Sequence, residues 1–294
     1  MSALAWSAMS VEEYASFERS QGERVVETNG FWWRQVRPFF FRPLLPFHEC
    51  APGSMHAPAR TLLGGYQVAV PPDAEANSHL SMLLFRQPQT YSVDGLPRTK
   101  RQQVLHAARE FTVRLLDDVG EFKEQGYPVY LSFVERTGYE YRSDRRQKAN
   151  FNLWAESVLR VPKNMVFGAY RDGQLQGVSI SRLVEDTIVY STMFSSAEAL
   201  ARNVNSLMLH ALREAASATP EVRQIFISIA SLSGRTSVEE FFFVRGCELV
   251  HLPALLWLNP LARLYLERRM PRQYAGLVGD PGPGEDPTTE SSGS

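Results

Sequence analysis

Residues 164–216 read NMVFGAYRDGQLQGVSISRLVEDTIVYSTMFSSAEALARNVNSLMLHALREAA, and this stretch decides the fold. Its first part predicts two paired strands, because an apolar run leads into Asp172-Gly173, a pair that tolerates the positive φ of a hairpin turn. A second turn at Glu185-Asp186 leads into a third strand over 188–194. The stretch therefore begins as an antiparallel meander of three strands.

A helix should follow the third strand. Ser195-x-x-Glu198 fits a capping box, which predicts Ser195 as the N-cap. Apolar residues then recur at three- and four-residue spacing up to Ala215, the pattern of one amphipathic helix packed on a sheet. The next buried strand, QIFISIA over 224–230, is joined to the third strand through this helix, so the two strands should be parallel. We expect them to diverge beside the start of the helix.

This order of elements resembles the acyl-CoA N-acyltransferase (GNAT) superfamily, especially its FemAB-like branch. AYRDGQLQGVSI resembles the family's strand-turn-strand, and VEEFFFVRGCELVHLPALLWL resembles its closing helix and strands. Residues 96–118 resemble the basic helix and first strand, and residues 122–159 the helical pair before the hairpin. The resemblance covers residues 96–258. It implies an α/β (α+β) fold whose mixed, mostly antiparallel sheet contains a splayed parallel strand pair.

The predicted organisation has three parts: an accessory region over 1–95, the acyltransferase-like core over 96–275, and a disordered tail over 276–294 that is rich in Pro, Gly and Ser. The resemblance suggests that the accessory region is a degenerate GNAT-like half. Within it, FWWRQVRPFFFRPLLPF over 31–47 concentrates aromatics among prolines. Core or interface packing is the favoured interpretation, and a lipid or anionic-ligand surface is the alternative.

Local signals add three helices. Ser10-x-x-Glu13 fits a capping box before a helix over 11–20. Pro128 is predicted in the first turn of a helix, where its missing N–H costs nothing, and an apolar stripe predicts another helix over 144–160. The basic helix over 96–110 is interpreted as a solvated face, with contact to a phosphate-bearing donor as the alternative.

Composition limits the function classes. The 294 residues carry a net charge of −1, which argues against a large nucleic-acid footprint. We expect a cytoplasmic location for three reasons. The chain has only two cysteines, residues 1–10 have neither the basic start nor the apolar core of a signal peptide, and no apolar run reaches about 20 residues. No Gly-x-Ser-x-Gly, Walker, His-Glu-x-x-His or paired Cys-x-x-Cys motif occurs, and the spacing of His48, Cys50 and His56 is too loose to predict a metal site.

The resemblance implies an N-acyltransferase, which moves an acetyl, acyl or aminoacyl group from an activated donor to the primary amine of a small molecule or peptide. Such an enzyme needs aligned reactants and amides for the oxyanion, so a nucleophile motif is not required. Acyl-CoA is a candidate donor, as are acyl carrier protein and aminoacyl-tRNA. RNVNS over 202–206 lacks both glycines of the family's CoA loop. The alternative is a non-catalytic binding or scaffold protein that retains the GNAT fold.

The resemblance to the GNAT elements also suggests candidate site residues. No metal ligand is expected among them. The catalytic candidates are Tyr190, Ser191 and Glu240, although Glu240 has a solvated helix face as its plain alternative. The candidates for holding the donor are Met193, Phe194, Ser195, Ser196, Arg202, Asn203 and Asn205. The candidates for binding substrate are Arg136, Tyr139, Tyr141, Ser228 and Ser231; surface packing explains the loop that holds the first three equally well.

Overall fold

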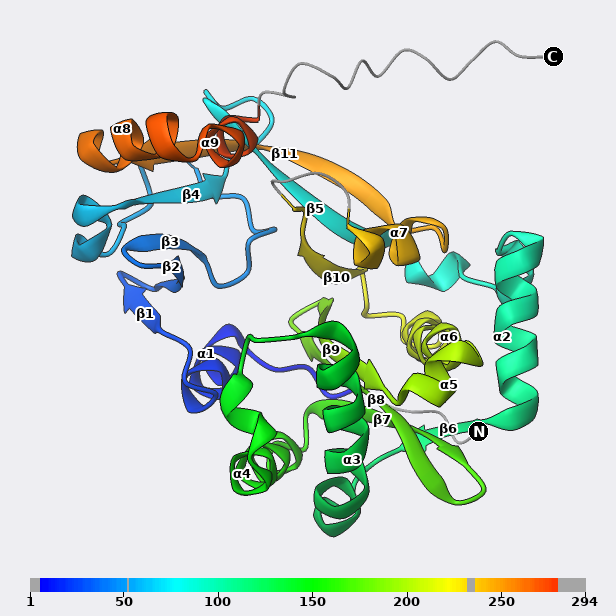
Figure 1. The fold of residues 1–294 in the computed structure, drawn as a ribbon. Helices are drawn as coiled ribbons and strands as arrows, with labels where there is room; N and C mark the ends of the chain where they lie inside the picture. Colours follow the sequence, from blue (N-terminus) through cyan, green and yellow to red (C-terminus); the bar gives the residue numbers. More distant parts are fainter. Residues whose placement is uncertain (1–5, 52, 232–235, 280–294) are drawn as a thin grey trace, which may run out of the picture. The chain divides into compact units, whose positions relative to one another are not determined.

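The computed structural model describes residues 6–51, 53–231 and 236–279 (Figure 1). The chain divides into two compact units, each built from segments that are far apart in the sequence. Unit 1 comprises Met1–Gln21, Leu84–Ser228 and Phe241–Glu248, and unit 2 comprises Gly22–Leu83, Ile229–Glu240 and Leu249–Ser294. The predicted boundaries at residues 95 and 275 stay a prediction. Of the predicted tail, residues 280–294 lie outside the described residues, and its first residues belong to a helix.

The quoted stretch forms the predicted meander in unit 1. β7 (Asn164–Arg171), β8 (Gln174–Val184) and β9 (Thr187–Ser195) pair antiparallel in that order. Asp172 and Gly173 adopt φ of 51° and 78° in the β7–β8 turn, as a tight hairpin requires. β6 (Thr112–Leu115) adds to β7 antiparallel, and β10 (Gln224–Ile229) adds to β9 parallel. The predicted mixed, mostly antiparallel sheet is therefore confirmed.

Helices cover both faces of the unit 1 sheet (Figure 1). On one face, α3 (Val119–Thr137) and α4 (Lys148–Leu159) enclose an aromatic core, in which Phe122 and Phe151 are fully buried with ring centroids 5.6 Å apart. On the other face lie α2 (Arg98–Glu110), α5 (Ala197–Ala201) and α6 (Val204–Ser217). This second core is made of small and aliphatic side chains such as Ala107 and Met208.

The N-terminal helix α1 (Val11–Ser20) also belongs to unit 1. It starts with the predicted capping box, since the Ser10 hydroxyl accepts from the Glu13 amide and the Glu13 carboxylate accepts from the Ser10 amide. Just before it, Met9 forms a parallel bridge with Val184 of β8. This bridge fixes the start of the chain to the meander.

The prediction for Pro128 is wrong. Pro128 lies in the middle of α3, which is capped by the Asp118 side chain and runs to Thr137. The proline removes one intrahelical hydrogen bond, but Phe122 before it and Tyr130 after it are buried in the same aromatic core. Packing on both sides of the proline holds the two halves of the helix together. The helix predicted over 144–160 is shorter, because residues 143–146 form a separate 3₁₀ turn before α4.

Unit 2 has its own strands in the order β1-β2-β3-β4-β11-β5. Its elements are β1 (Val25–Thr28), β2 (Phe31–Arg37), β3 (Phe40–Pro43), a 3₁₀ turn (Ala59–Leu63), β4 (Gly65–Ala69), α8 (Pro260–Arg269) and α9 (Pro271–Val278), with most of β5 (Ser78–Arg86) and β11 (Glu248–Leu258). Trp33 and Phe41 from the aromatic segment over 31–47 are fully buried, which supports the packing interpretation of that segment. α7 (Ser237–Phe243) has residues in both units.

Candidate functional site

The parallel pair β9 and β10 separates soon after it begins. Only Thr187–Val189 of β9 and Gln224–Phe226 of β10 are in register. β9 continues to Ser195 and β10 to Ile229. The sequence predicted a parallel pair that diverges beside a helix start near Ser196, and the structure confirms it.

The divergence leaves particular backbone amides on the open edge of β9. The Ser196 amide donates to the Gln176 carbonyl of β8, 3.0 Å away. Because hydrogen-bonded positions alternate in an antiparallel pair, Phe194 and Thr192 also face β8. Met193 and Ser195 therefore direct their amides to the other side, where no described residue of β10 is in register with them. Among the described residues, the β9–β10 ladder therefore does not use these two amides.

A β-bulge lies just before these amides. Ile180 pairs with Thr192 and Ser181 pairs with Tyr190, so Ser191 is an extra residue without a partner on β8. A bulge bends its strand and changes the direction of the residues that follow. Nothing in the sequence around Ser191 signals it.

Tyr190 places its phenol against the face of the sheet that α6 covers. Burial raises the pKa of this phenol, and the neighbouring Ser179 hydroxyl offsets part of the rise. The ring also packs edge-on against Phe242, with centroids 5.7 Å apart. A phenol with a raised pKa stays protonated at neutral pH and gives up its proton less readily, so Tyr190 is chemically suited to donate a hydrogen bond rather than a proton.

Four hydroxyls on this face form what we term the hydroxyl cluster: Ser179, Ser181, Tyr190 and Ser195. Each oxygen is buried and makes no hydrogen bond of ordinary length and angle to another described residue, although the Ser179 hydroxyl is near enough to the Tyr190 phenol to lower its pKa. Oδ1 of Asn205, at the start of α6, likewise makes no such hydrogen bond. A buried hydroxyl left unsatisfied costs about 1–3 kcal/mol. A core packed for stability alone would place aliphatic side chains here.

The helix start differs from its prediction. Ser195 is the fully buried last residue of β9, and Ser196 is the N-cap whose hydroxyl accepts from the Ala199 amide. Glu198 does not complete a capping box; its carboxylate pairs with Arg171 at 2.8 Å. The single predicted helix is also broken, because Asn203 has a positive φ of 64° between α5 and α6. Because Ser195 and Ser196 are adjacent, the sequence alone did not decide which one is the N-cap. Ser195 belongs to β9 and Ser196 caps the helix.

The remaining donor-binding candidates lie on different sides of β9. Met193 packs on the side of α2 and α6, and Phe194 is buried in the aromatic core, 5.5 Å from the Tyr130 ring. Arg202 contacts Glu110 at 2.6 Å and Glu198 at 3.6 Å. The structure therefore places Tyr190, Met193 and Ser195 along one face of β9. The Phe194 ring and the Ser191 hydroxyl, which accepts from Arg182, point to the opposite face.

The groups expected to hold a CoA pyrophosphate are engaged with the protein itself. The Ala197 amide donates to the Ser132 hydroxyl at 3.1 Å and the Ala199 amide to Ser196 at 3.2 Å. Arg202 is occupied by its two carboxylates, and α5 is only five residues long. These residues do not fit a pyrophosphate cradle as they stand, so no step is assigned to CoA.

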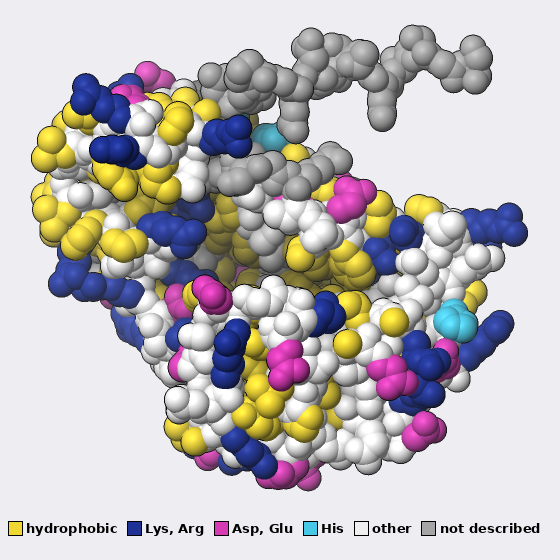
Figure 2. Space-filling view, viewed as in Figure 1, with side chains coloured by type: hydrophobic (Ala, Val, Ile, Leu, Met, Phe, Trp, Pro, Cys, Tyr) yellow, Lys and Arg dark blue, Asp and Glu magenta, His cyan; other side chains and the backbone are white. Residues whose placement is uncertain are grey.

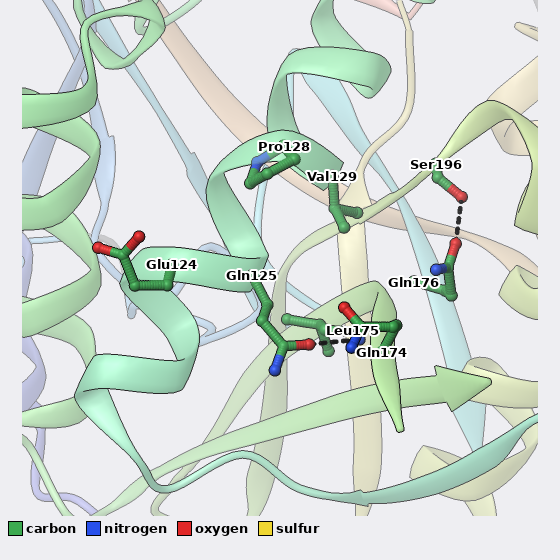
Figure 3. Close-up of a pocket in the computed structure, with 8 residues that line it drawn as sticks. All are labelled: Glu124, Gln125, Pro128, Val129, Gln174, Leu175, Gln176 and Ser196. Carbon is green, nitrogen blue, oxygen red and sulfur yellow. Dashed lines mark hydrogen bonds between the residues drawn. The ribbon is translucent and has the colours of Figure 1, made fainter. Parts of the chain in front are cut away.

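A hollow of about 320 Å³ lies beside the cap (Figure 3). Its wall includes Pro128 and Val129 of α3 and residues 174–176 of β8. Gln125 accepts the Leu175 amide through Oε1 at 2.8 Å, and Gln176 accepts the Ser196 hydroxyl through Oε1 at 2.9 Å. The Glu124 carboxylate points away from these groups in Figure 3 and pairs with Lys148. The recess is thus lined by glutamine amides, apolar side chains and one carboxylate that is paired with a lysine.

The loop after α3 carries three of the substrate-binding candidates. The Tyr139 ring lies 5.5 Å from Phe133 and 6.2 Å from the exposed Tyr141, and the Arg136 guanidinium lies 5.9 Å from the Phe133 ring. Burial raises the pKa of Tyr139 to about 12. Phe133 in turn contacts Phe194 of β9, with ring centroids 6.3 Å apart. The loop is thus connected to β9 through the aromatic core rather than through the hydroxyl cluster.

The last candidates lie on β10 and on the segment after it. Ser228 is on the end of β10 that no longer pairs with β9. Ser231 and Glu240 belong to unit 2, where Glu240 is exposed on α7. The buried carboxylate there is Glu239, which accepts the amides of Ser231 at 2.6 Å and Thr236 at 2.7 Å. Glu239 caps its own helix, and no chemical step is assigned to Glu240.

Within residues 6–51, 53–231 and 236–279, no three His, Cys, Asp or Glu side chains are grouped so that they would hold a metal ion. No helix in the same ranges has the length and apolarity to cross a membrane.

Comparisons with known proteins show the fold. No family model and no curated protein matches the chain by sequence. Among solved structures, the chain is similar to FemX (TM-score 0.54, 11% identity, 87% of this chain and 92% of FemX). It is also similar to L-PGS from Bacillus licheniformis (0.54, 10%, 94% and 92%). A third match is the C-terminal DUF2156 domain of an Agrobacterium fabrum protein named as a lysylphosphatidylglycerol synthetase candidate (0.55, 11%, 90% and 91%). The predicted GNAT-like fold, in the form found in FemX and L-PGS, is confirmed.

Proposed function

We propose that this chain is an N-acyltransferase, which moves an acyl group from an activated donor to a primary amine. The observation that carries the proposal is the divergence of β9 from β10 beyond Val189, which leaves the amides of Met193 and Ser195 on an open strand edge. Amides fixed in this way can stabilise the oxyanion that forms when an amine attacks an acyl carbon. The fold shared with FemX and L-PGS supports the same class of reaction.

The proposed chemistry uses two features of β9. The amine nitrogen bonds to the acyl carbon, and the carbonyl oxygen gains negative charge that the Met193 amide stabilises. As the tetrahedral intermediate collapses, the bond to the leaving group breaks; the amine nitrogen gives its proton to water, and the leaving group takes up one proton from water. The Tyr190 phenol, kept protonated because burial raises its pKa, is proposed to donate a hydrogen bond to the negative charge that develops in this step.

An aminoacyl-tRNA is the donor that these observations favour over acyl-CoA or an acyl carrier protein. The amides and the arginine expected at a pyrophosphate are already bound to protein groups. In contrast, α2 carries the exposed Arg98 and Arg109 and the partly buried Lys100, and in Figure 2 the side chains over this helix include Lys or Arg as well as Asp or Glu. Exposed arginines suit the phosphates of a nucleic-acid donor. The lysylphosphatidylglycerol synthetase name of one similar structure points to aminoacyl transfer as well.

The test is a donor screen followed by one substitution. Purified protein is offered aminoacyl-tRNA, acyl-CoA and acyl carrier protein with a panel of amines, and the acylated product is detected by mass spectrometry. Tyr190→Phe should then lower kcat by about 100-fold, the lower end of the range for removing a hydrogen-bond donor to developing charge. Tyr170→Phe is the matched control, because it too removes a buried phenol oxygen without a regular hydrogen bond, but from β7 and away from the divergence.

Two results would contradict the proposal. Transfer that is equally fast with Tyr190→Phe and Tyr170→Phe would remove Tyr190 from the chemistry. No transfer from any of the three donors, by protein shown to be folded, would favour a binding or scaffold protein with the same fold.

A further inference from the structure

Arg182 is a buried charge in the middle of β8. The residue is only 2% exposed, and a buried guanidinium is costly unless it is paired and hydrogen-bonded. Its Nη1 lies 3.5 Å from Oε1 of Glu18 in α1, and that carboxylate is also buried. Its Nε donates to Oδ1 of Asn164 at 2.9 Å, and its planar group lies over the Phe17 ring at 4.3 Å. The residue is therefore held from several sides.

One more contact of Arg182 leads to the bulge. Nη1 donates to the hydroxyl of Ser191 at 2.6 Å, and Ser191 is the extra residue that is in register with no residue of β8. The bulge is thus fixed by a side chain from the neighbouring strand, and that side chain is fixed by α1. Met193, whose amide faces the open edge, follows two residues later.

α1 is attached to the meander by a second, separate contact. The Glu13 carboxylate pairs with Lys163, which precedes β7, at 2.6 Å. This pair is partly exposed, and among the described residues its hydrogen bonds join Lys163 to Glu13 rather than to Arg182 or Ser191. The two attachments of α1 can therefore be weakened independently of each other.

We propose that Arg182 is a positioning residue, which uses Glu18 as its counter-charge to hold the bulge at Ser191 and thereby to aim the Met193 amide. The inference rests on the proposed function, because it gives the amide a role in acyl transfer. Arg182 itself touches no reacting atom. A long-range consequence is that the N-terminal helix takes part in shaping the site on β9.

The experiment uses Ser191 rather than Arg182, because removal of the arginine would leave Glu18 buried without its partner and endanger the fold. Ser191→Ala removes the contact to the bulge and keeps Arg182 with Glu18 and Asn164, while Ser191→Thr retains a hydroxyl. Lys163→Ala is the matched control, since it weakens the other attachment of α1. The readouts in the full chain are the ¹H–¹⁵N signals of the Met193 and Ser195 amides, and kcat and KM with the donor found in the screen.

The proposal expects Ser191→Ala to shift both amide signals and to lower kcat about tenfold at unchanged donor KM, less than the roughly 100-fold loss of a whole oxyanion donor. Ser191→Thr should restore both, and Lys163→Ala should change neither. Unmoved signals in Ser191→Ala, or equal shifts in Lys163→Ala, would overturn the proposal. If the unmodified protein transfers no acyl group but the signals shift as expected, the acyl-transfer role fails while the control of the bulge by Arg182 stands.

Discussion

The two faces of β8 and β9 differ in the side chains that they bury: aromatic and aliphatic groups on one face, hydroxyls on the other. Toward α3 and α4, Val178, Ile180 and Phe194 join a core of interlocking aromatic rings. Toward α6, the same strands present a glycine at 177 and the hydroxyl cluster, with oxygens that have no regular hydrogen bond within the described chain. The first face stabilises the fold. The second face contributes less to stability, because it buries hydroxyls in place of aliphatic side chains. The Tyr190 phenol points to this face, and a functional site is often less stable than the rest of its fold.

The largest loss of stability should follow a substitution on the aromatic face, toward α3 and α4. Phe151 is fully buried and packs against the rings of Phe122, Tyr130 and Trp154. Phe151→Ala should lower the free energy of unfolding by about 3–5 kcal/mol through lost contacts and the cavity left behind. Urea unfolding measures the change, with Leu153→Ala on the same helix as control, since Leu153 is 67% exposed. A loss below about 1 kcal/mol would show that this face is not the stabilising one.

An intermediate loss of stability is expected from a substitution of Gly177, which lies on the face toward α6. A Cβ at this position would lie 2.9 Å from Cε and 3.2 Å from Sδ of Met208 in α6. Gly177→Ala should therefore cost about 1–3 kcal/mol, toward the lower end because a methionine side chain can move. Thermal unfolding checks this against Gly95→Ala, where the added Cβ would meet open space. Equal melting temperatures for the two variants would mean that α6 is not packed closely on β8.

The smallest effect on stability should come from the hydroxyl cluster itself. Ser179→Ala removes an oxygen that has no regular partner, so the free energy of unfolding should stay within about 1 kcal/mol or rise. The pKa of Tyr190 should rise further, because Ser179 now offsets part of the effect of burial. Calorimetry and ultraviolet titration measure the two quantities. A large destabilisation would show that the Ser179 hydroxyl has a strong partner, and the contrast between the faces would disappear.

Much of unit 1 was predictable because its signals are local. The Asp172-Gly173 turn, the capping box at Ser10 and the apolar stripe of α6 each depend on residues within one turn or one helix. The parallel order of β9 and β10 followed from the helix between them. The candidates Tyr190 to Ser195 were chosen from that topology, and the structure places them along the diverging strand.

The parts that were missed depend on contacts distant in sequence. The bulge at Ser191 is held by Arg182, and Arg182 is balanced by Glu18, 164 residues earlier in the chain. One signal did exist, because an arginine within the apolar run VSISRLV of a buried strand implies a partner. Asn203 breaks the predicted helix without a glycine or proline to announce it. Pro128 stays inside α3 because packing on both sides outweighs the lost hydrogen bond.

Residue-by-residue amide hydrogen exchange along β9 is the most direct test of the open strand edge. Thr192 and Phe194 direct their amides to β8, whereas Met193 and Ser195 direct theirs to the side that β10 leaves open. We predict an alternation in the protein without donor, with Met193 and Ser195 exchanging faster than Thr192 and Phe194. Uniform protection of all four amides would contradict the account, because Met193 would then already be hydrogen-bonded and unable to receive an oxyanion.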